Sequence, residues 1–269
     1  CSSFNYASEF NDQSFQSVSM SNEPNKNDYS NAIIVEYRNH YNSYYDYLKM
    51  QLQKFNPEGE RKRAILISTG SFCPIHKGHL QLIDNAAIFL SRDHNIDTLV
   101  GIISPESDFT VKLKYGQSAI PFEQRYEMAN LACKEHNSQE TGKDKMVYIT
   151  TDTFDESQID NVDFRFVIDR IKNEIKEQFP TENLLVLFVC GGDMFIDKRF
   201  SEQDEIVGIS RDGIRIETET NVGKNLYICN DFVKDEVMNI KVTKDNFEDV
   251  KENMHESVVK YLHDVVHWI

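Results

Sequence analysis

Short apolar runs alternate with amphipathic stretches from about residue 61 to the end of the chain. The apolar runs have the length of strands and lie at residues 64–68, 98–103, 146–150, 184–190, 206–209 and 226–229. Between them, apolar side chains recur every three or four positions around residues 80–90, 122–134 and 164–179, as on one face of a helix. Strands that alternate with helices in this way predict a doubly wound, parallel α/β sheet. Because such sheets bind ligands beyond the carboxyl ends of their strands, we expect the chemistry directly after the apolar runs.

The first 60 residues follow a different pattern. Residues 1–30 are rich in Ser and Asn, hold almost no aliphatic side chain and show no period, which predicts a polar tail. In residues 31–60, apolar and tyrosine side chains recur at helical spacing between Ile33 and Phe55. We expect a helix that packs on the main body, with a tyrosine-lined docking surface for a partner as the alternative. The predicted organisation is a tail (1–30), a helical extension (31–60) and an α/β domain (61–269).

The end of the chain again shows helical spacing. One face of residues 257–269 carries Val258, Leu262, Val265, Val266 and Ile269. We therefore expect a packed helix there.

Charge and composition narrow the classes of function. The chain has 29 Lys and Arg against 44 Asp and Glu, a formal net charge of −15, and such a surface repels phosphate backbones, so we expect no nucleic-acid partner. Its longest apolar run is about seven residues, against roughly 20 for a membrane span, which predicts no membrane insertion. The five cysteines are scattered without a CxxC pair, which favours reduced thiols in an intracellular compartment. The pattern does not choose among cytoplasm, nucleus and mitochondrion.

The most informative segment joins the first predicted strand to the following helix and reads GSFCPIHKGH at residues 70–79. Gly70 permits a tight exit from the strand and a close approach of a ligand to the backbone. A helix that begins near Lys77 points free N–H groups at the loop, which suits an anion. His76 and His79 can donate hydrogen bonds to phosphate oxygens and stabilise the charge that builds there during transfer.

As GxFxPxHxGH, this segment resembles the signature of the HxGH nucleotidyltransferase superfamily, which transfers a nucleotidyl group from a triphosphate and expels pyrophosphate. The matching residues are Gly70, Phe72, Pro74, His76, Gly78 and His79. The resemblance implies a Rossmann-like nucleotidyltransferase fold and a catalytic role for His76 and His79.

Later segments resemble one branch of that superfamily, the eukaryotic nicotinamide or nicotinate mononucleotide adenylyltransferases. Residues 104–108 (SPESD) are similar to the SPxxD segment of that branch, 152–154 (DTF) to its DTW triplet, 190–193 (CGGD) to its CGAD motif and 210–211 (SR) to its TR pair. The resemblance implies that ATP is bound by Gly70, Ser71, Phe72, Gly78, Lys112, Lys114, Gly191, Asp193, Arg211 and Thr243. It implies that the mononucleotide is bound by Ser71, Phe72, Thr153 and Phe154.

The resemblance implies adenylyl transfer from ATP to nicotinamide or nicotinate mononucleotide, giving NAD or its acid form and pyrophosphate, with Mg²⁺ carried in by ATP. Two positions depart from the pattern. Phe154 replaces a Trp and keeps a stacking face. Asn246 stands where the ISSTxxR motif places its Arg, and loss of such a contact typically costs on the order of 10² to 10³ in rate.

Three interpretations stay open. The first is an active adenylyltransferase. The second is a weakened or silent family member that serves as a structural or assembly subunit, and the third is another HxGH nucleotidyltransferase that acts on phosphopantetheine or a small alcohol phosphate. Assembly with a second copy or another protein would use the tail and helix of residues 1–60.

Several site residues also have plain structural explanations. Lys112 and Lys114 lie in a predicted polar loop, where solvated lysines are common, and Gly191 would also suit a tight strand exit. The acidic residues around Asp152 predict a solvated loop, and we expect no protein metal site. The sequence does not distinguish the amide from the acid mononucleotide.

Overall fold

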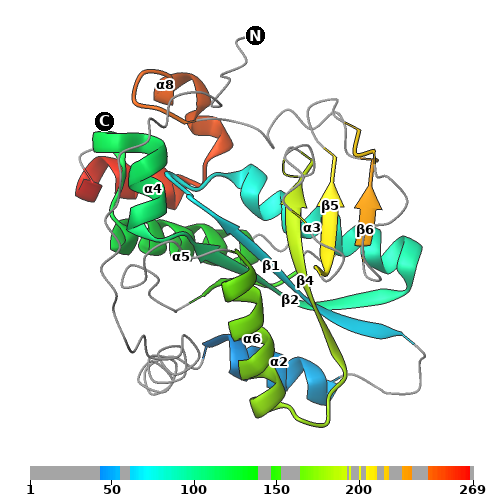
Figure 1. Ribbon diagram of the computed structural model, residues 1–269. Helices are drawn as coiled ribbons and strands as arrows, with labels where there is room; N and C mark the ends of the chain where they lie inside the picture. The colour runs from blue at the N-terminus through cyan, green and yellow to red at the C-terminus, as the bar shows by residue number, and fades with distance from the viewer. Residues whose placement is uncertain are drawn as a thin grey trace, which may run out of the picture. The chain divides into compact units, whose positions relative to one another are not determined.

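Six parallel strands form the centre of the structure, a computed structural model that describes residues 43–54, 61–138, 147–152, 164–192, 194, 200, 204–210, 215–217, 226–231 and 242–266. The strands are β1 (Lys62–Gly70), β2 (Ile96–Pro105), β3 (Ile149–Thr151), β4 (Leu184–Gly191), β5 (Ile206–Ile209) and β6 (Leu226–Cys229). Their order across the sheet is β3-β2-β1-β4-β5-β6 (Figure 1). The chain thus builds outward from β1 in one direction and from β4 in the other, which confirms the doubly wound sheet.

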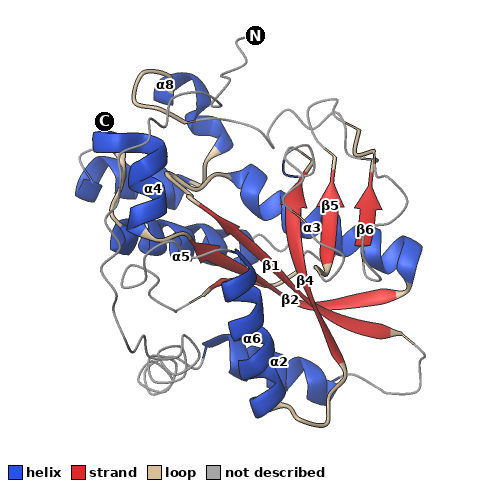
Figure 2. Cartoon of the chain, in the orientation of Figure 1, coloured by secondary structure: helices blue, strands red, loops and turns tan. Residues whose placement is uncertain are grey.

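Helices cover both faces of this sheet (Figure 2). On one face lie α3 (Lys77–His94) and α5 (Phe122–Ser138), with α9 (Glu256–Tyr261) packed on α5. On the other face lie α2 (Ser43–Lys54) and α6 (Phe164–Gln178). Side chains of β1 alternate between the two faces of the sheet. Ala64 and Leu66 join the first core, between the sheet and helices α3 and α5, and Ile65 and Ile67 join the second core, between the sheet and helices α2 and α6.

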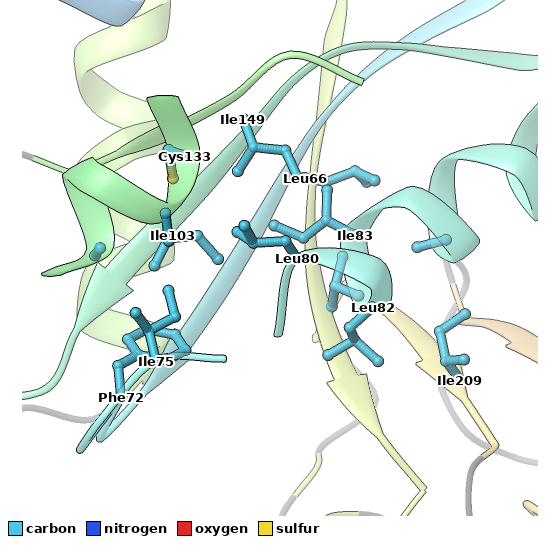
Figure 3. Packing of buried hydrophobic residues seen from close by; sticks show 14 of the residues in the cluster. Leu66, Phe72, Ile75, Leu80, Leu82, Ile83, Ile103, Cys133, Ile149 and Ile209 are labelled. Carbon is cyan, nitrogen blue, oxygen red and sulfur yellow. The ribbon is translucent and has the colours of Figure 1, made fainter. Parts of the chain in front are cut away.

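Close packing joins α3 to the middle of the sheet. A Cβ atom added at Gly101 of β2 would lie 2.6 Å from Cγ2 of Ile83 on α3, so only glycine fits there. Figure 3 shows Ile83 beside Leu66, Leu80 and Ile149 in this core. The helix is thereby fixed against β2, the strand that comes directly after it in the chain.

The remaining elements are short. They are α4 (Asp108–Tyr115), α8 (Phe247–Val250) and the single turns η1 (Gly116–Ser118), η4 (Lys251–Asn253) and η5 (Leu262–Val266). Helix α4 corrects the predicted loop around Lys112 and Lys114. In the C-terminal stretch, Val258 and Leu262 are buried as expected, whereas Val265 is 49 % exposed, contrary to prediction. In η5, which is wound more widely than an α-helix, Leu262 and Val266 pack on the core as predicted and Val265 does not.

The predicted N-terminal helix is confirmed for Ser43–Lys54, and the polar tail lies outside the described residues. Tyr44 and Leu48 are buried in the second core. Residues 42–269 form one compact unit that includes α2, whereas the division of the chain at residues 30 and 60 stays a prediction. Among the described residues, no helix combines the length and apolar character needed to cross a membrane.

Candidate active site

The loop from β1 to α3 lies at the point where the order of the strands reverses. Strand β1 ends at Gly70 and its neighbour β4 ends at Gly191, and each of these glycines lies three residues beyond Ile67 and Phe188, the last residues that pair between the two strands. Crevices at such points bind ligands in doubly wound folds. The sequence prediction of the site therefore coincides with the position that the topology favours.

Two apolar side chains anchor this loop in the core. Phe72, with a positive φ of 42°, and Ile75 are both buried among residues of α3 and α5 (Figure 3). A Cβ atom at Gly70 would approach Cε1 of Phe72 to 3.1 Å. Glycine at position 70 thus leaves room for the ring that holds the loop down.

His76 and His79 meet at the first turn of α3. The backbone N–H of His76 donates to Nδ1 of His79 at 3.1 Å, and the two ring centroids are 3.8 Å apart. The rings of Phe72 and His79 lie nearly perpendicular to each other, with centroids 4.9 Å apart. Because Nδ1 of His79 accepts a hydrogen bond, its neutral imidazole carries the proton on Nε2.

The start of α3 favours negative charge. The helix is 18 residues long and has no acidic residue in its first turn, so its N–H groups and dipole produce a positive potential at the loop. Lys77 adds a positive charge there, and its Nζ donates to the backbone oxygen of Glu252 at 2.8 Å. This bond ties the turn η4 to the beginning of α3.

Lys114 reaches the same loop from α4. Its Nζ lies 2.7 Å from Oε2 of Glu106 and 3.1 Å from Oγ of Ser71, whose hydroxyl also donates to Glu106 at 2.8 Å. Lys112 is exposed on the same helix. Of the two predicted lysines, the structure therefore places Lys114 at Ser71, where it is paired with the carboxylate of Glu106.

A buried arginine holds these pieces together. Arg125 of α5 is 0 % exposed and donates to the backbone oxygens of Ser71 at 3.0 Å and Ile120 at 2.8 Å, and to Oδ1 of Asp108 at 3.1 Å. The sequence pattern gave no sign of this role, because an arginine that serves backbone oxygens of distant loops has no local signature.

The C-terminal segment shows what Asn246 does at the position where the ISSTxxR motif of the similar enzymes has an Arg. The N–H and the hydroxyl of Thr243 donate to Oδ1 of Asn246 at 2.7 and 3.1 Å. Asn246 therefore shapes the turn that leads into α8. The exposed Lys244 lies next to Thr243 and carries a positive charge.

The acidic loop prediction is wrong for Asp152, which is 1 % exposed. The hydroxyl of Ser104 donates to its Oδ2 at 2.9 Å, and Arg170 forms an ion pair with the same oxygen. Burial of a carboxylate requires such partners, and both are far away in the sequence. Four predicted site residues lie outside the described residues: Thr153, Phe154, Asp193 and Arg211.

Comparison with known proteins places the chain in a family. The cytidylyltransferase-like family model matches residues 67–260, and the chain therefore belongs to the cytidylyltransferase-like family. No curated protein sequence gives a significant match.

Two solved structures share the fold. Nicotinic acid mononucleotide adenylyltransferase of Plasmodium falciparum complexed with APC is 20 % identical with a TM-score of 0.50, and the match covers 77 % of this chain and 98 % of that chain. The same enzyme complexed with NaAD is 19 % identical with a TM-score of 0.51 and the same coverage. At these identities the likeness establishes the fold.

Proposed function

We propose that the protein is a nucleotidyltransferase that transfers the adenylyl group of ATP to nicotinamide or nicotinate mononucleotide. The observation that carries this proposal is the pair of His76 and His79 at the start of α3, after the carboxyl end of β1 and at the point where the strand order reverses. Family membership supports nucleotidyl transfer, and the residues 152–154 and 190–193 support the mononucleotide as acceptor.

The reaction needs alignment more than proton transfer. An oxygen of the 5′-phosphate attacks the α-phosphorus of ATP, the new P–O bond forms, and the bond to the bridging oxygen breaks with its electron pair leaving on pyrophosphate. Since the attacking phosphate is already largely dianionic at neutral pH, no side chain has to act as a general base.

The residues of the loop would stabilise charge on the phosphates. Nε2–H of His79 would donate to a phosphate oxygen, since its Nδ1 already accepts from the backbone of His76. The N–H groups at the start of α3 would add their dipoles. Lys114 would exchange its ion pair with Glu106 for the triphosphate, a small cost because the lysine side chain is 49 % exposed.

We propose that Mg²⁺ enters with ATP, because phosphate oxygens are ligands that this hard cation prefers. The imidazole, ammonium and hydroxyl groups beside the loop suit phosphate oxygens better than Mg²⁺, and the carboxylate of Glu106 is paired with Lys114 and Ser71. Bound Mg²⁺ would neutralise charge on the departing pyrophosphate.

The test compares His79→Ala with His263→Ala, a change at a histidine that is exposed on η5. Dinucleotide formation is followed with ATP, Mg²⁺ and either mononucleotide. We expect His79→Ala to lower kcat by on the order of 10² to 10³, because a donor to developing charge is lost. His263→Ala should match the parent.

The parent also decides between the amide and the acid substrate through the ratio of its two kcat/KM values. A parent that forms no dinucleotide from either mononucleotide would contradict the proposal. A large fall in Tm of His79→Ala would show that this ring serves packing instead.

The assembly-subunit alternative has one observation in its favour. At the position of the family's Arg, Asn246 has an uncharged side chain that is engaged with Thr243. An inactive parent that purifies in a stable complex with another protein would support this alternative.

A further inference from the structure

Helix α2 lies outside the region that the family model matches, yet it is built into the domain. The match begins at residue 67, whereas α2 spans Ser43–Lys54 and belongs to the same compact unit as the sheet. Figure 1 shows α2 beside α6, and hydrogen bonds between the two helices agree with this view. The extension thus supplies a structural part of the α/β domain.

The first contact of α2 is with the beginning of β3. The ring of Tyr47 stacks on that of Tyr148, with centroids 3.8 Å apart and planes 19° apart. Strand β3 has only three residues and lies at the edge of the sheet, paired with β2. Such a short edge strand gains its position from neighbours on its faces.

The second contact of α2 reaches the end of β3 through charged side chains. Asp152 directly follows the strand and forms an ion pair with Arg170 of α6. Nη1 of Arg170 in turn lies 3.1 Å from Oε1 of Glu174, one helical turn further along α6. All three residues are buried, so the energy of this network depends strongly on its hydrogen bonds.

Two hydroxyl groups of α2 complete the network. The phenols of Tyr44 and Tyr45 donate to Oε2 of Glu174, the oxygen that Arg170 leaves to them. Burial raises the pKa of both phenols, and the charge of Glu174 raises it further, so they remain donors over the physiological range. The hydroxyls of α2 thus occupy Oε2 of Glu174, while Nη1 of Arg170 bonds Oε1 and Nη2 of Arg170 pairs with Asp152.

This network acts on one half of the sheet. Doubly wound sheets consist of two halves, each of which holds one nucleotide beside the point where the strand order reverses. Strands β1, β2 and β3 form one half here, and its outer strand β3 is flanked by Tyr148, which α2 contacts directly, and Asp152, which α2 reaches through α6. A change in α2 should therefore disturb one substrate more than the other.

We infer that α2 positions the carboxyl end of β3 through Tyr44, Tyr45, Glu174 and Arg170, and so tunes the affinity for the mononucleotide. The assignment of this half to the mononucleotide rests on the proposed function, in which residues 153 and 154 contact that substrate. The tyrosines are positioning residues, because they act on the site through Arg170 and Asp152.

The test uses the full chain with Tyr45→Phe and the double change Tyr44→Phe, Tyr45→Phe. Tyr227→Phe on β6 is the matched control, as it removes a hydroxyl from a half-buried tyrosine of the opposite half. We expect the double variant to raise KM for the mononucleotide roughly three- to tenfold, the effect of weakened charged hydrogen bonds. KM for ATP should stay within about twofold of the parent.

Hydrogen exchange provides a second measurement that does not depend on activity. The N–H of Asp152, bonded to the backbone oxygen of Ile103 at 2.7 Å, and the amides of β3 should exchange faster in the double variant. Amides of β1 and β4 should keep their parental rates. If the double variant folds poorly, the single variant Tyr45→Phe replaces it, and it should show the same changes to a smaller degree.

Unchanged exchange in β3, or an equal rise of both KM values, would overturn the inference. A parent without turnover would refute the proposed function alone, since the exchange pattern still decides whether α2 positions β3. Faster exchange confined to β3 would then support the positioning role by itself.

Discussion

At the scale of single residues, the site differs from the sequence prediction mainly in its pairings. The sequence predicts His76, His79 and Lys114 as phosphate ligands, and the structure adds the groups that orient them. His79 is held by the backbone of His76, and Lys114 lies between Glu106 and Ser71. In the proposed reaction, these partners decide which atom of each side chain would face a phosphate.

Lys114→Ala tests this arrangement. The variant should raise KM for ATP roughly tenfold, because a charge-assisted contact to the triphosphate is lost and Glu106 is left as an unbalanced negative charge. Steady-state kinetics with varied ATP measure the effect, with the exposed Lys134→Ala as control. An unchanged KM would mean that Lys114 serves only Glu106.

At the scale of elements, fit between α3 and the sheet decides where the histidines lie. The helix begins at Lys77 directly after the loop, and its buried face is fixed against β2 at Gly101. Any shift of α3 away from the sheet would carry His79 with it. The packing in Figure 3 therefore supports both stability and the geometry of the site.

Gly101→Ala should destabilise the protein by about 1–3 kcal/mol, since the added methyl would lie 2.6 Å from Cγ2 of Ile83. Urea denaturation measures the loss. Ile83→Ala in the same chain should relieve the clash, so the cost of Gly101→Ala should be smaller in that background. Equal costs in both backgrounds would show that another contact is responsible.

At the scale of the whole molecule, the net charge of −15 is compatible with the proposed phosphate-binding site because the positive potential is local. It is produced by the start of α3, Lys77 and Lys114.

Acid conditions affect the stability of the fold through a buried histidine, His255. His255 is 2 % exposed, lies 3.4 Å from Oε1 of Glu135, and is also near His136 and Lys77.

Stability should therefore fall as the pH drops below about 6.5. Burial lowers the pKa of the His255 imidazole, against the charge of Glu135, so the unfolded chain binds this proton more readily. The stabilisation is complete above the ordinary histidine pKa and is lost on acidification. Burial disfavours the charged form of Glu135, but hydrogen bonds from the N–H groups of Ser257 and Glu256 and from the Ser257 hydroxyl hold its pKa below the usual range. Protonation of Glu135 at lower pH therefore causes a further loss of stability.

Urea denaturation at several pH values between 5 and 8 measures this dependence. In His255→Phe the slope between pH 5 and 7 should be shallower by up to about 1.4 kcal/mol per pH unit, the limit for one proton. His263→Phe, at an exposed ring, is the control. A slope that is the same in His255→Phe would assign the effect to other groups.

The order of strands and helices could be predicted because each element has its own period of apolar residues. All six predicted strands are present, and α3, α5 and α6 lie where helical spacing places them. Helix α4 was missed because its single buried residue, Val111, gives no apolar face to detect. Asp152 was misplaced because its partners Ser104 and Arg170 are 48 and 18 residues away.

By itself, the sequence determined the loop between β1 and α3, its histidines and the kind of ligand they suit. Those residues are contiguous, so local geometry brings them together. Only the tertiary structure decided that β4 lies beside β1, that Arg125 and Lys114 meet Ser71, and that α2 reaches Asp152 through Arg170. A parallel sheet joins the ends of strands that are distant in the chain, and which side chains then meet depends on packing that no local pattern encodes.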